Sequence, residues 1–319
     1  GCIVDVMAGP GSRRYSGRLH LHRAPEAGYP SRVRRKLQFQ LQSLWAARDC
    51  DVVCNFGRFD YLKALLQLGK PVMHTFHNPI DQAQVDAAEQ LAGSSAVLFH
   101  CISAHQHNQA IFRRPTRVIP NPVDAHLYRE GSEDRRYLAF LGRLTWNKGV
   151  DVAIRAARQA GRLLLLAGPV PAEPGAQQLF NAVVQPALDR GEARWLGSVD
   201  DSGKQELLGG AEALLFPIRW DEPFGLVMTE ALACGTPVIA TRRASTPEVI
   251  RHGITGFLCD PAEPDPASFV EAIRRLPQLD RRQCRLDVVR RFSVEAIGSK
   301  LLMALEALAA GEMQVENSA

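Results

Sequence analysis

Short apolar runs alternate with longer amphipathic stretches along this chain. In the first third the apolar runs are continuous, which is typical of strands buried on both faces of a parallel sheet, and the stretches between them have helical spacing. Because strand and helix alternate, we expect a doubly wound sheet. The pattern predicts strands at 3–7, 51–55, 71–75, 96–101 and 117–119, and helices at 32–47, 59–68, 82–92 and 104–111.

The same alternation restarts after a polar stretch and continues almost to the end of the chain. Two such α/β units predict two open parallel sheets that face a central cleft, with a ligand at the carboxyl ends of the strands. In this half, strands are predicted at 137–141, 163–167, 193–196, 213–216, 238–241 and 256–258, and helices at 150–160, 176–189, 203–209, 226–233, 247–251, 266–275 and 294–309.

The length of 319 residues exceeds that of a usual single core, so two domains are expected. The fold class is α/β with two Rossmann-like domains. The predicted parts are an N-terminal domain at 1–122, a linker at 123–136, a C-terminal domain at 137–292, a helix at 293–310 that packs back toward the N-terminal domain, and a tail at 311–319.

Composition narrows the class of protein. Hydrophobic residues make up 46% and charged residues 23%, as in ordinary soluble domains, and the seven scattered cysteines include no C-x-x-C pair, which favours a reducing cytoplasm. No apolar run approaches the ~20 residues of a membrane span. The net charge is +4, and many of the basic residues lie near the start of the chain. They are interpreted either as a solvated basic face or as a surface for peripheral contact with the inner membrane face or with an anionic acceptor. We expect no nucleic acid partner. The basic residues are Arg13, Arg14, Arg18, Arg23, Arg32, Arg34, Arg35 and Lys36.

The stretch WDEPFGLVMTEALACGTPVIAT carries the most chemistry. Pro223 and Gly225 stand where a helix begins, so free N–H groups and the positive end of the helix dipole face the same space as Glu222. Glu230 follows a little over two turns later among apolar neighbours, which disfavours a solvated position. Two acids placed in this way suit an elongated, partly anionic ligand that is rich in hydroxyls.

A second polar group follows the strand YLAFL. Arg143 and Lys148 are expected at its carboxyl end, beside the N-terminus of the next helix. Arg offers a planar fork and Lys a point charge, so together they suit a diphosphate. On its own, an Arg at a strand end is more often part of a surface ion pair.

Taken together, GRLTWNKG, EPFGLVMTEALACGTPVIAT, STPEVI and HGITGFLCDP resemble the nucleotide-sugar-binding domain of retaining glycosyltransferase family 4, which has the GT-B fold. The resemblance begins in the first domain with DVVCNFGRFDYLKALLQLGKPVMHTFHN and keeps its order over most of the chain. It implies a transferase that takes a sugar from a nucleotide-sugar donor, UDP- or GDP-linked, and uses no cofactor and no metal.

The resemblance also implies roles for single residues. Arg143 and Lys148 would hold the donor diphosphate, Glu222 would lie near the transferred sugar, Glu230 would hold the ribose hydroxyls, and His77 would contact the sugar from the first domain. Backbone contacts to sugar or phosphate are implied for Phe224, Gly225 and Leu226, and further donor-side positions are Gly142, Ser245, Thr246 and Glu248.

With both glutamates assigned to the donor, no side chain remains as a nucleophile. As is proposed for such families, we expect front-face transfer with retention, in which the departing phosphate helps to deprotonate the acceptor hydroxyl. The acceptor is a hydroxyl of a sugar, a glycan, a lipid-linked or a small molecule. The alternative is a nucleotide-sugar-binding protein of the same fold that has lost catalysis. A dinucleotide oxidoreductase is disfavoured, because no G-x-G-x-x-G follows a predicted strand.

Two features depart from the family pattern. Family members open with a strand, a Gly-rich turn and a helix, about 30 residues long, whereas this chain starts at what resembles their second strand. In TRRASTPEVI, Ala244 and Ser245 stand where many relatives have two glycines. A turn that needs positive φ would be strained by alanine, so either the loop differs or this is a subfamily variant.

Overall fold

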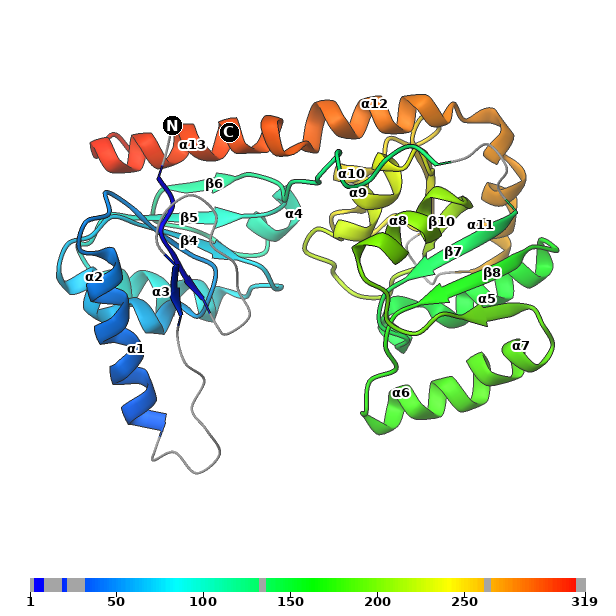
Figure 1. Cartoon of the computed structure of the whole chain (residues 1–319), viewed down its shortest axis with the longest axis horizontal. Helices are drawn as coiled ribbons and strands as arrows, with labels where there is room; N and C mark the ends of the chain where they lie inside the picture. Colours follow the sequence, from blue (N-terminus) through cyan, green and yellow to red (C-terminus); the bar gives the residue numbers. More distant parts are fainter. Residues whose placement is uncertain (1–2, 9–18, 22–31, 132–135, 261–264, 314–319) are drawn as a thin grey trace. The chain divides into compact units, whose positions relative to one another are not determined.

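Figure 1 presents the chain as a computed structural model in which two compact units are distinguished. We call them unit 1 and unit 2 and describe each by itself. Unit 1 comprises Gly1–Cys101, His107–Val118 and Leu301–Ala319, and unit 2 comprises Ile102–Gln106 and Ile119–Lys300. The residues that the structure describes are 3–8, 19–21, 32–131, 136–260 and 265–313.

Unit 1 is built on a parallel sheet in the order β3-β4-β5-β6, as the apolar runs predict. β5 is buried along its whole length, and α3 begins with a capping box between Asp81 and Gln84. β1 (Val6–Ala8) and β2 (Leu19–Leu21) form a separate parallel pair. The other elements of unit 1 are α1 (Arg32–Ala47), β3 (Val53–Asn55), the 3-10 helix η1 (Phe59–Leu62), α2 (Lys63–Gln67), β4 (Val72–Phe76), α3 (Gln82–Ala92), β5 (Val97–Cys101) and β6 (Thr116–Val118). The short helix α4 (Ala104–His107) belongs to unit 2 up to Gln106.

The helix expected at 104–111 is shorter in the structure, where α4 ends at His107. The reason lies in Ile111, whose backbone is held by a side chain instead of by helix hydrogen bonds. Ile111 N donates to Gln82 Oε1 at 2.8 Å, and Gln82 Nε2 donates to Ile111 O at 3.1 Å. Both main-chain groups of Ile111 are therefore satisfied outside a helix.

Unit 2 contains a six-stranded parallel sheet in the order β12-β11-β10-β7-β8-β9. This is the doubly wound Rossmann order, with the reversal between β7 and β10. Its elements are β7 (Tyr137–Leu141), η2 (Trp146–Lys148), α5 (Val150–Gln159), β8 (Leu163–Ala167), α6 (Pro174–Leu179), the π-helix η3 (Phe180–Val184), α7 (Gln185–Asp189), β9 (Ala193–Trp195), α8 (Asp201–Gly209), β10 (Ala211–Phe216), α9 (Leu226–Ala233), β11 (Val238–Thr241), α10 (Thr246–Val249), β12 (Gly256–Cys259), α11 (Pro266–Arg274), η4 (Leu276–Gln278) and α12 (Arg281–Phe292). The last helix, α13 (Val294–Ala310), begins in unit 2 and belongs to unit 1 from Leu301 on.

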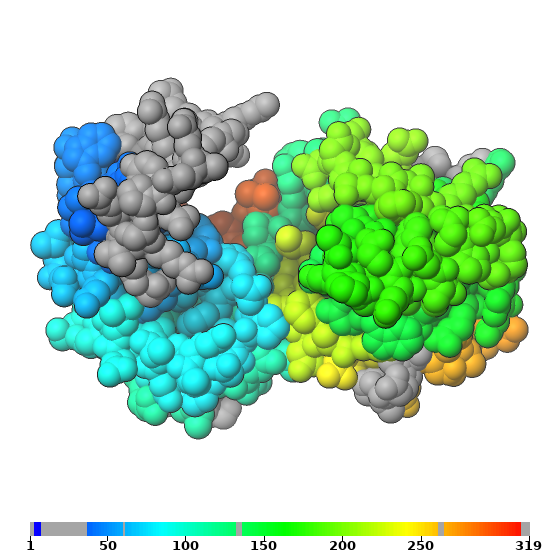
Figure 2. Space-filling model, turned by 90° about the horizontal axis from the view of Figure 1, so that it is seen from below, coloured from blue at the N-terminus to red at the C-terminus, as the bar shows by residue number. Residues whose placement is uncertain are grey.

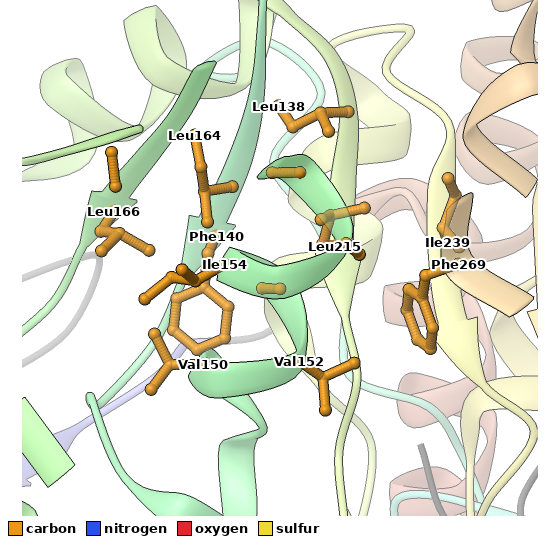
Figure 3. Close-up of a cluster of buried hydrophobic side chains, with 14 of the residues drawn as sticks. Leu138, Phe140, Val150, Val152, Ile154, Leu164, Leu166, Leu215, Ile239 and Phe269 are labelled. Carbon is orange, nitrogen blue, oxygen red and sulfur yellow. The ribbon is translucent and has the colours of Figure 1, made fainter. Parts of the chain in front are cut away.

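The core of unit 2 lies between the sheet and the α5–α11 layer. Alternate residues of each strand point into it, such as Leu138 and Phe140 on β7 and Leu164 and Leu166 on β8, where they meet Ile154 of α5 (Figure 3). α8 and α9 contact β10, and α12 packs on α9. α6 and α7 lie within the green part of unit 2 in the space-filling view of Figure 2. Burial on both strand faces explains the continuous apolar runs.

Residues 123–131 of the stretch expected to be a linker belong to unit 2 and pack within it. Val123 N donates to Phe292 O at 2.8 Å, Val123 forms a bridge with Ser293, and Tyr128 is only 4% exposed. α13 matches the predicted final helix. α12 was not expected, because its five arginines hide the buried positions Cys284 and Val288.

The side chains of the basic residues near the start lie outside the part of the chain that the structure describes. Arg13, Arg14, Arg18 and Arg23 lie outside the described residues, and the side chains of Arg32, Arg34, Arg35 and Lys36 do so as well. Within the part of the chain that the structure describes, no helix combines the length and apolarity that crossing a bilayer requires.

Candidate active site

The candidate site lies where the strand order of unit 2 reverses. β7 and β10 are neighbours in the sheet, yet the helices after them enter different layers, since α5 packs on α11 and α9 packs on α12. In an open α/β sheet such a reversal leaves a crevice at the carboxyl ends of the strands, where ligands bind. The loops that start there, 142–149 and 217–225, carry most of the residues predicted to bind the donor.

Backbone contacts fix the two loops against each other. Gly149 has φ 74°, and a Cβ at this position would lie 1.9 Å from Pro217 O, so no other residue fits without movement. Arg219 N donates to Asn147 O at 2.8 Å. The Arg219 guanidinium then grips Asp151 at the start of α5 with two hydrogen bonds of 2.7 and 2.9 Å. This rigid frame determines where the side chains of both loops point.

Lys148 and Glu222, which are 74 positions apart, meet at the centre of this frame. Lys148 Nζ donates to Glu222 Oε2, and Trp220 Nε1 donates to the same oxygen at 2.9 Å. The ammonium also lies 4.6 Å from the centre of the Trp220 ring, within the range of a cation–π contact. Both charged side chains are largely buried. The contact neutralises two charges that would otherwise be costly to bury.

Arg143 is placed differently from Lys148, although both follow β7. Its side chain is exposed, and it has no ion-pair partner among the residues that the structure describes. Gly142, just before it, has φ 156°. Of the two cations, Lys148 is paired with Glu222, whereas Arg143 is exposed to solvent.

The turn into α9 is tightly held. Gly225 has φ 79°, and a Cβ there would lie 2.8 Å from Met228 Cε. Phe224 is buried with its ring centre 5.8 Å from that of Phe292, and Ser245 Oγ lies 2.9 and 3.0 Å from the carbonyl oxygens of Glu222 and Phe224. Leu226, the first residue of α9, is half-exposed. The first N–H groups of a helix have no partner within it, so this tip can bind an acceptor atom.

Glu230 projects from α9 into a polar cluster. Its Oε1 accepts from the Tyr128 hydroxyl at 3.0 Å and from Lys204 Nζ at 3.2 Å. The residue is 8% exposed, and its Oε2 is buried with no hydrogen-bond partner among the described residues. A buried acceptor without a partner costs free energy, which a ligand donor would recover.

Two of the weaker donor-side predictions have other contacts in the structure. The Thr246 hydroxyl is buried within its own turn, 2.7 Å from Thr241 O and 2.9 Å from Arg243 O. The Glu248 carboxylate accepts from the N–H groups of Ala104 and His105 at 2.8 and 2.7 Å. These contacts occupy both side chains in the unliganded protein.

His77 belongs to unit 1, where it directly follows β4. Its ring centre lies 5.6 Å from that of Phe56, and partial burial lowers its pKa, so the ring is neutral at pH 7. His74, three residues earlier, is buried, and its Nδ1 lies 2.9 Å from Asn55 Nδ2. Burial lowers the pKa of His74 to about 4.

Three residues of the cluster were absent from the sequence prediction: Trp220, Tyr128 and Lys204. Trp220 is the first residue of the stretch WDEPFGLVMTEALACGTPVIAT. Its aromatic ring two positions before Glu222 was the signal that could have indicated a contact with that acid. Tyr128 lies in the stretch expected to be a linker, and Lys204 lies on a predicted helix far from the motifs. No local pattern points either of them toward Glu230.

With this geometry in place, comparison with known proteins identifies the family. The family model described as "Glycosyl transferases group 1" matches residues 128–287, which is half of the chain and includes the whole cluster of Lys148, Glu222 and Glu230. The chain belongs to this family. A second family model, described as "Glycosyltransferase Family 4", matches residues 1–127 of this chain. The resemblance seen in the sequence is thereby confirmed.

Curated relatives of this group 1 chain include two bacterial enzymes. It is 32% identical over 166 residues to the alpha-maltose-1-phosphate synthase of Mycolicibacterium smegmatis, and 31% identical over 184 residues to the D-inositol 3-phosphate glycosyltransferase of Acidothermus cellulolyticus. The matches cover 49% and 50% of this chain, but only 43% and 40% of the two relatives.

Solved structures of similar fold cover more of the group 1 chain. The sucrose-phosphate synthase of Thermosynechococcus elongatus has a TM-score of 0.76 at 19% identity and covers 96% of this chain and 89% of its own. Anabaena Alr3699/HepE, in complex with UDP and glucose, has a TM-score of 0.73 at 20% identity and covers 91% and 86%. These similarities establish the GT-B fold with two Rossmann-like domains.

Proposed function

We propose that this protein transfers a sugar from a UDP- or GDP-linked donor to a hydroxyl acceptor, with retention of anomeric configuration and without a metal ion. The observation that carries this proposal is the buried Oε2 of Glu230, which has no partner among the described residues and lies on the helix whose first turn begins beside the Lys148–Glu222 pair. An acceptor for hydroxyls and a cation for phosphate thus belong to one rigid frame. A complex of a protein with this fold, HepE with UDP-glucose, supports the same class of ligand.

Each end of the donor has a matching group. The diphosphate would contact Arg143, which is exposed and unpaired among the described residues, and would draw Lys148 away from Glu222. Glu222 would then accept from a sugar hydroxyl, and the N–H groups at the start of α9 would bind sugar or phosphate oxygens. The ribose hydroxyls would donate to Glu230. Lys148 would thus exchange one anionic partner for another, whereas Glu222 would exchange the Lys148 ammonium for a neutral hydroxyl donor.

The reaction proceeds by breaking the bond between the sugar C1 and the diphosphate oxygen, which keeps the bonding electrons. Positive charge grows on C1 and negative charge on the phosphate, so Lys148 and Arg143 stabilise the leaving group where a metal would otherwise serve. The acceptor oxygen attacks C1 on the same face, and its proton passes to the departing phosphate. This route gives retention without the nucleophilic carboxylate that retaining glycosidases use.

A thermal-shift panel with UDP, GDP, ADP and their glucose and mannose conjugates tests the donor class. A ligand at a hundred times its Kd stabilises the fold by about 2.7 kcal/mol, which raises the melting temperature by roughly 5–10 °C for a unit of this size. Glu230→Gln is the matched control and should reduce the shift. If no nucleotide raises the melting temperature, the proposal is wrong.

Turnover separates the enzyme from its alternative, a binding protein that has lost catalysis. The donor that gives the largest shift is incubated with the full chain, and release of the nucleoside diphosphate is followed with and without simple sugar acceptors. Hydrolysis or transfer above the rate of the Lys148→Ala variant supports the enzyme. Saturable binding with no release in either protein supports the binding protein.

A further inference from the structure

The carboxylate of Glu230 is held on one side only. Both neighbours that donate to it, the Tyr128 hydroxyl and the Lys204 ammonium, meet Oε1 at 3.0 and 3.2 Å. Oε2 is buried and has no partner within the described part of the chain. Two donors on Oε1 and none on Oε2 fix the direction in which the second oxygen could accept a hydrogen bond.

Tyr128 and Lys204 are themselves firmly anchored. Tyr128 is 4% exposed, and its carbonyl oxygen accepts from the Arg285 guanidinium at 2.6 Å. Lys204 also donates to Asp201 at 3.1 Å, one turn earlier on α8. The Asp200 side chain caps this helix through Gly203 N at 2.8 Å. The two donors therefore form a rigid support for the Glu230 side chain.

The two donors of this cluster, Tyr128 and Lys204, keep their protons over the physiological range. Burial and the nearby Glu230 carboxylate raise the pKa of Tyr128 well above its usual range, so its hydroxyl remains a donor. Partial burial opposes the charged form of Lys204, but Glu230 and Asp201 outweigh this effect and raise its pKa. The Tyr128 hydroxyl and the Lys204 ammonium therefore both remain donors toward Glu230 Oε1.

We infer that Tyr128 and Lys204 are positioning residues for Glu230, which hold Oε1 so that Oε2 receives the vicinal hydroxyls of the donor ribose. The inference rests on the proposed role of Glu230 toward a nucleotide. It adds a basis for specificity, because a buried oriented acceptor rejects a ligand that lacks its hydroxyl more strongly than a mobile one does. Tyr128 and Lys204 would thus set the preference for ribose over deoxyribose without touching the ligand.

The test measures discrimination between hydroxyls in addition to affinity. Kd values are determined by titration calorimetry for the strongest binder among UDP, GDP and ADP and for its 2′-deoxy and 3′-deoxy forms. A hydrogen bond to a charged group predicts a preference of roughly 10- to 100-fold for the ribonucleotide in the unchanged protein. Tyr128→Phe and Lys204→Met should each reduce this preference about 3- to 10-fold, and Lys204→Arg should restore most of it.

Tyr137→Phe is the matched control. Its hydroxyl donates to Glu206 O at 3.3 Å and to Leu207 O at 3.0 Å, on the helix that carries Lys204, and neither bond involves Glu230, so its loss should leave the preference unchanged. With a sugar donor, the positioning variants should raise KM and change kcat little, because the ribose contact is the same in the ground and transition states. Melting temperatures verify that each variant is folded.

Two results would overturn the inference, and they are distinguishable. If Tyr128→Phe and Lys204→Met weaken ribo- and deoxynucleotides equally while Glu230→Gln abolishes the preference, the two residues only support the fold, and the proposed function stands. If the unchanged protein binds none of the three nucleotides, or binds ribo- and deoxynucleotides equally, the role of Glu230 is wrong and the inference fails with it.

Discussion

Ala244 is the one residue other than glycine with positive φ in the described part of the chain, and replacing it by glycine should stabilise the protein. Its φ is 53°, and it turns the chain from β11 into α10. The next residue, Ser245, is fully buried and bonds the carbonyl oxygens of the turn into α9. The surroundings therefore impose the left-handed conformation on Ala244.

The expected gain follows from two opposing terms. The left-handed conformation costs an L-residue with a Cβ roughly 1–2 kcal/mol. Glycine removes this cost but gives the unfolded chain more freedom, worth about 0.4–1 kcal/mol. The net effect of Ala244→Gly is a stabilisation of about 0.5–1 kcal/mol. For a domain of this size, that raises the melting temperature by roughly 1–4 °C.

Tryptophan fluorescence can follow this change in unit 2. Three of the four tryptophans, at 146, 195 and 220, belong to that unit. Urea and thermal unfolding of Ala244→Gly are compared with Ala182→Gly, an exposed position in the π-helix η3 between α6 and α7, where glycine should cost about 0.5–1 kcal/mol. If both substitutions lower stability, Ala244 is not strained, and the argument from its φ is refuted.

Three further predictions concern the site and the stability of the fold. Lys148→Ala should lower kcat by at least about 100-fold with a much smaller change in KM, because the leaving group is charged mainly in the transition state; steady-state kinetics with an unchanged kcat would exclude this role. His74, whose pKa is about 4, leaves the folded state neutral while the unfolded state takes up a proton below pH 6.5. Stability should therefore fall by about 1.4 kcal/mol per unit from pH 6.5 to 4, and urea midpoints for His74→Gln should lose this part of the slope, whereas equal slopes would contradict the assignment. Gly149→Ala should lower the melting temperature by several degrees through its contact with Pro217 O, and a variant that melts like the unchanged protein would disprove the close packing.

The fold could be predicted largely because its signals are local. Strands buried on both faces leave continuous apolar runs, and both sheets follow from them. α12 shows where this reasoning fails. Its buried residues Cys284, Val288 and Phe292 recur every four positions, but the arginines between them dominate the composition. Several of these arginines bind backbone carbonyl groups, as Arg281 binds Ala211 O and Glu212 O, a use that no local pattern reveals.

The site was predictable as a set of residues but not as a set of contacts. The motifs predicted that Lys148 and Glu222 both contribute to one binding site. Their direct pairing could not be predicted, because the two residues are 74 positions apart and meet only through the packing of their loops. The partners of Glu230 were beyond reach for the same reason. The sequence around Tyr128 and around Lys204 carries no recognisable signal. Both residues become partners of Glu230 only because the fold places α9 beside them.

The contact between Gly149 and Pro217 has a consequence for reading mutational scans of this protein. An activity screen would mark Gly149 as intolerant as strongly as the neighbouring Lys148, although glycine only makes room for a backbone oxygen. Cellular abundance would separate the two positions. Substitutions at Gly149 should deplete the folded protein, whereas Lys148→Arg should leave its abundance near normal and still impair turnover. A map that combines both readouts would distinguish residues that build the catalytic frame from residues that use it.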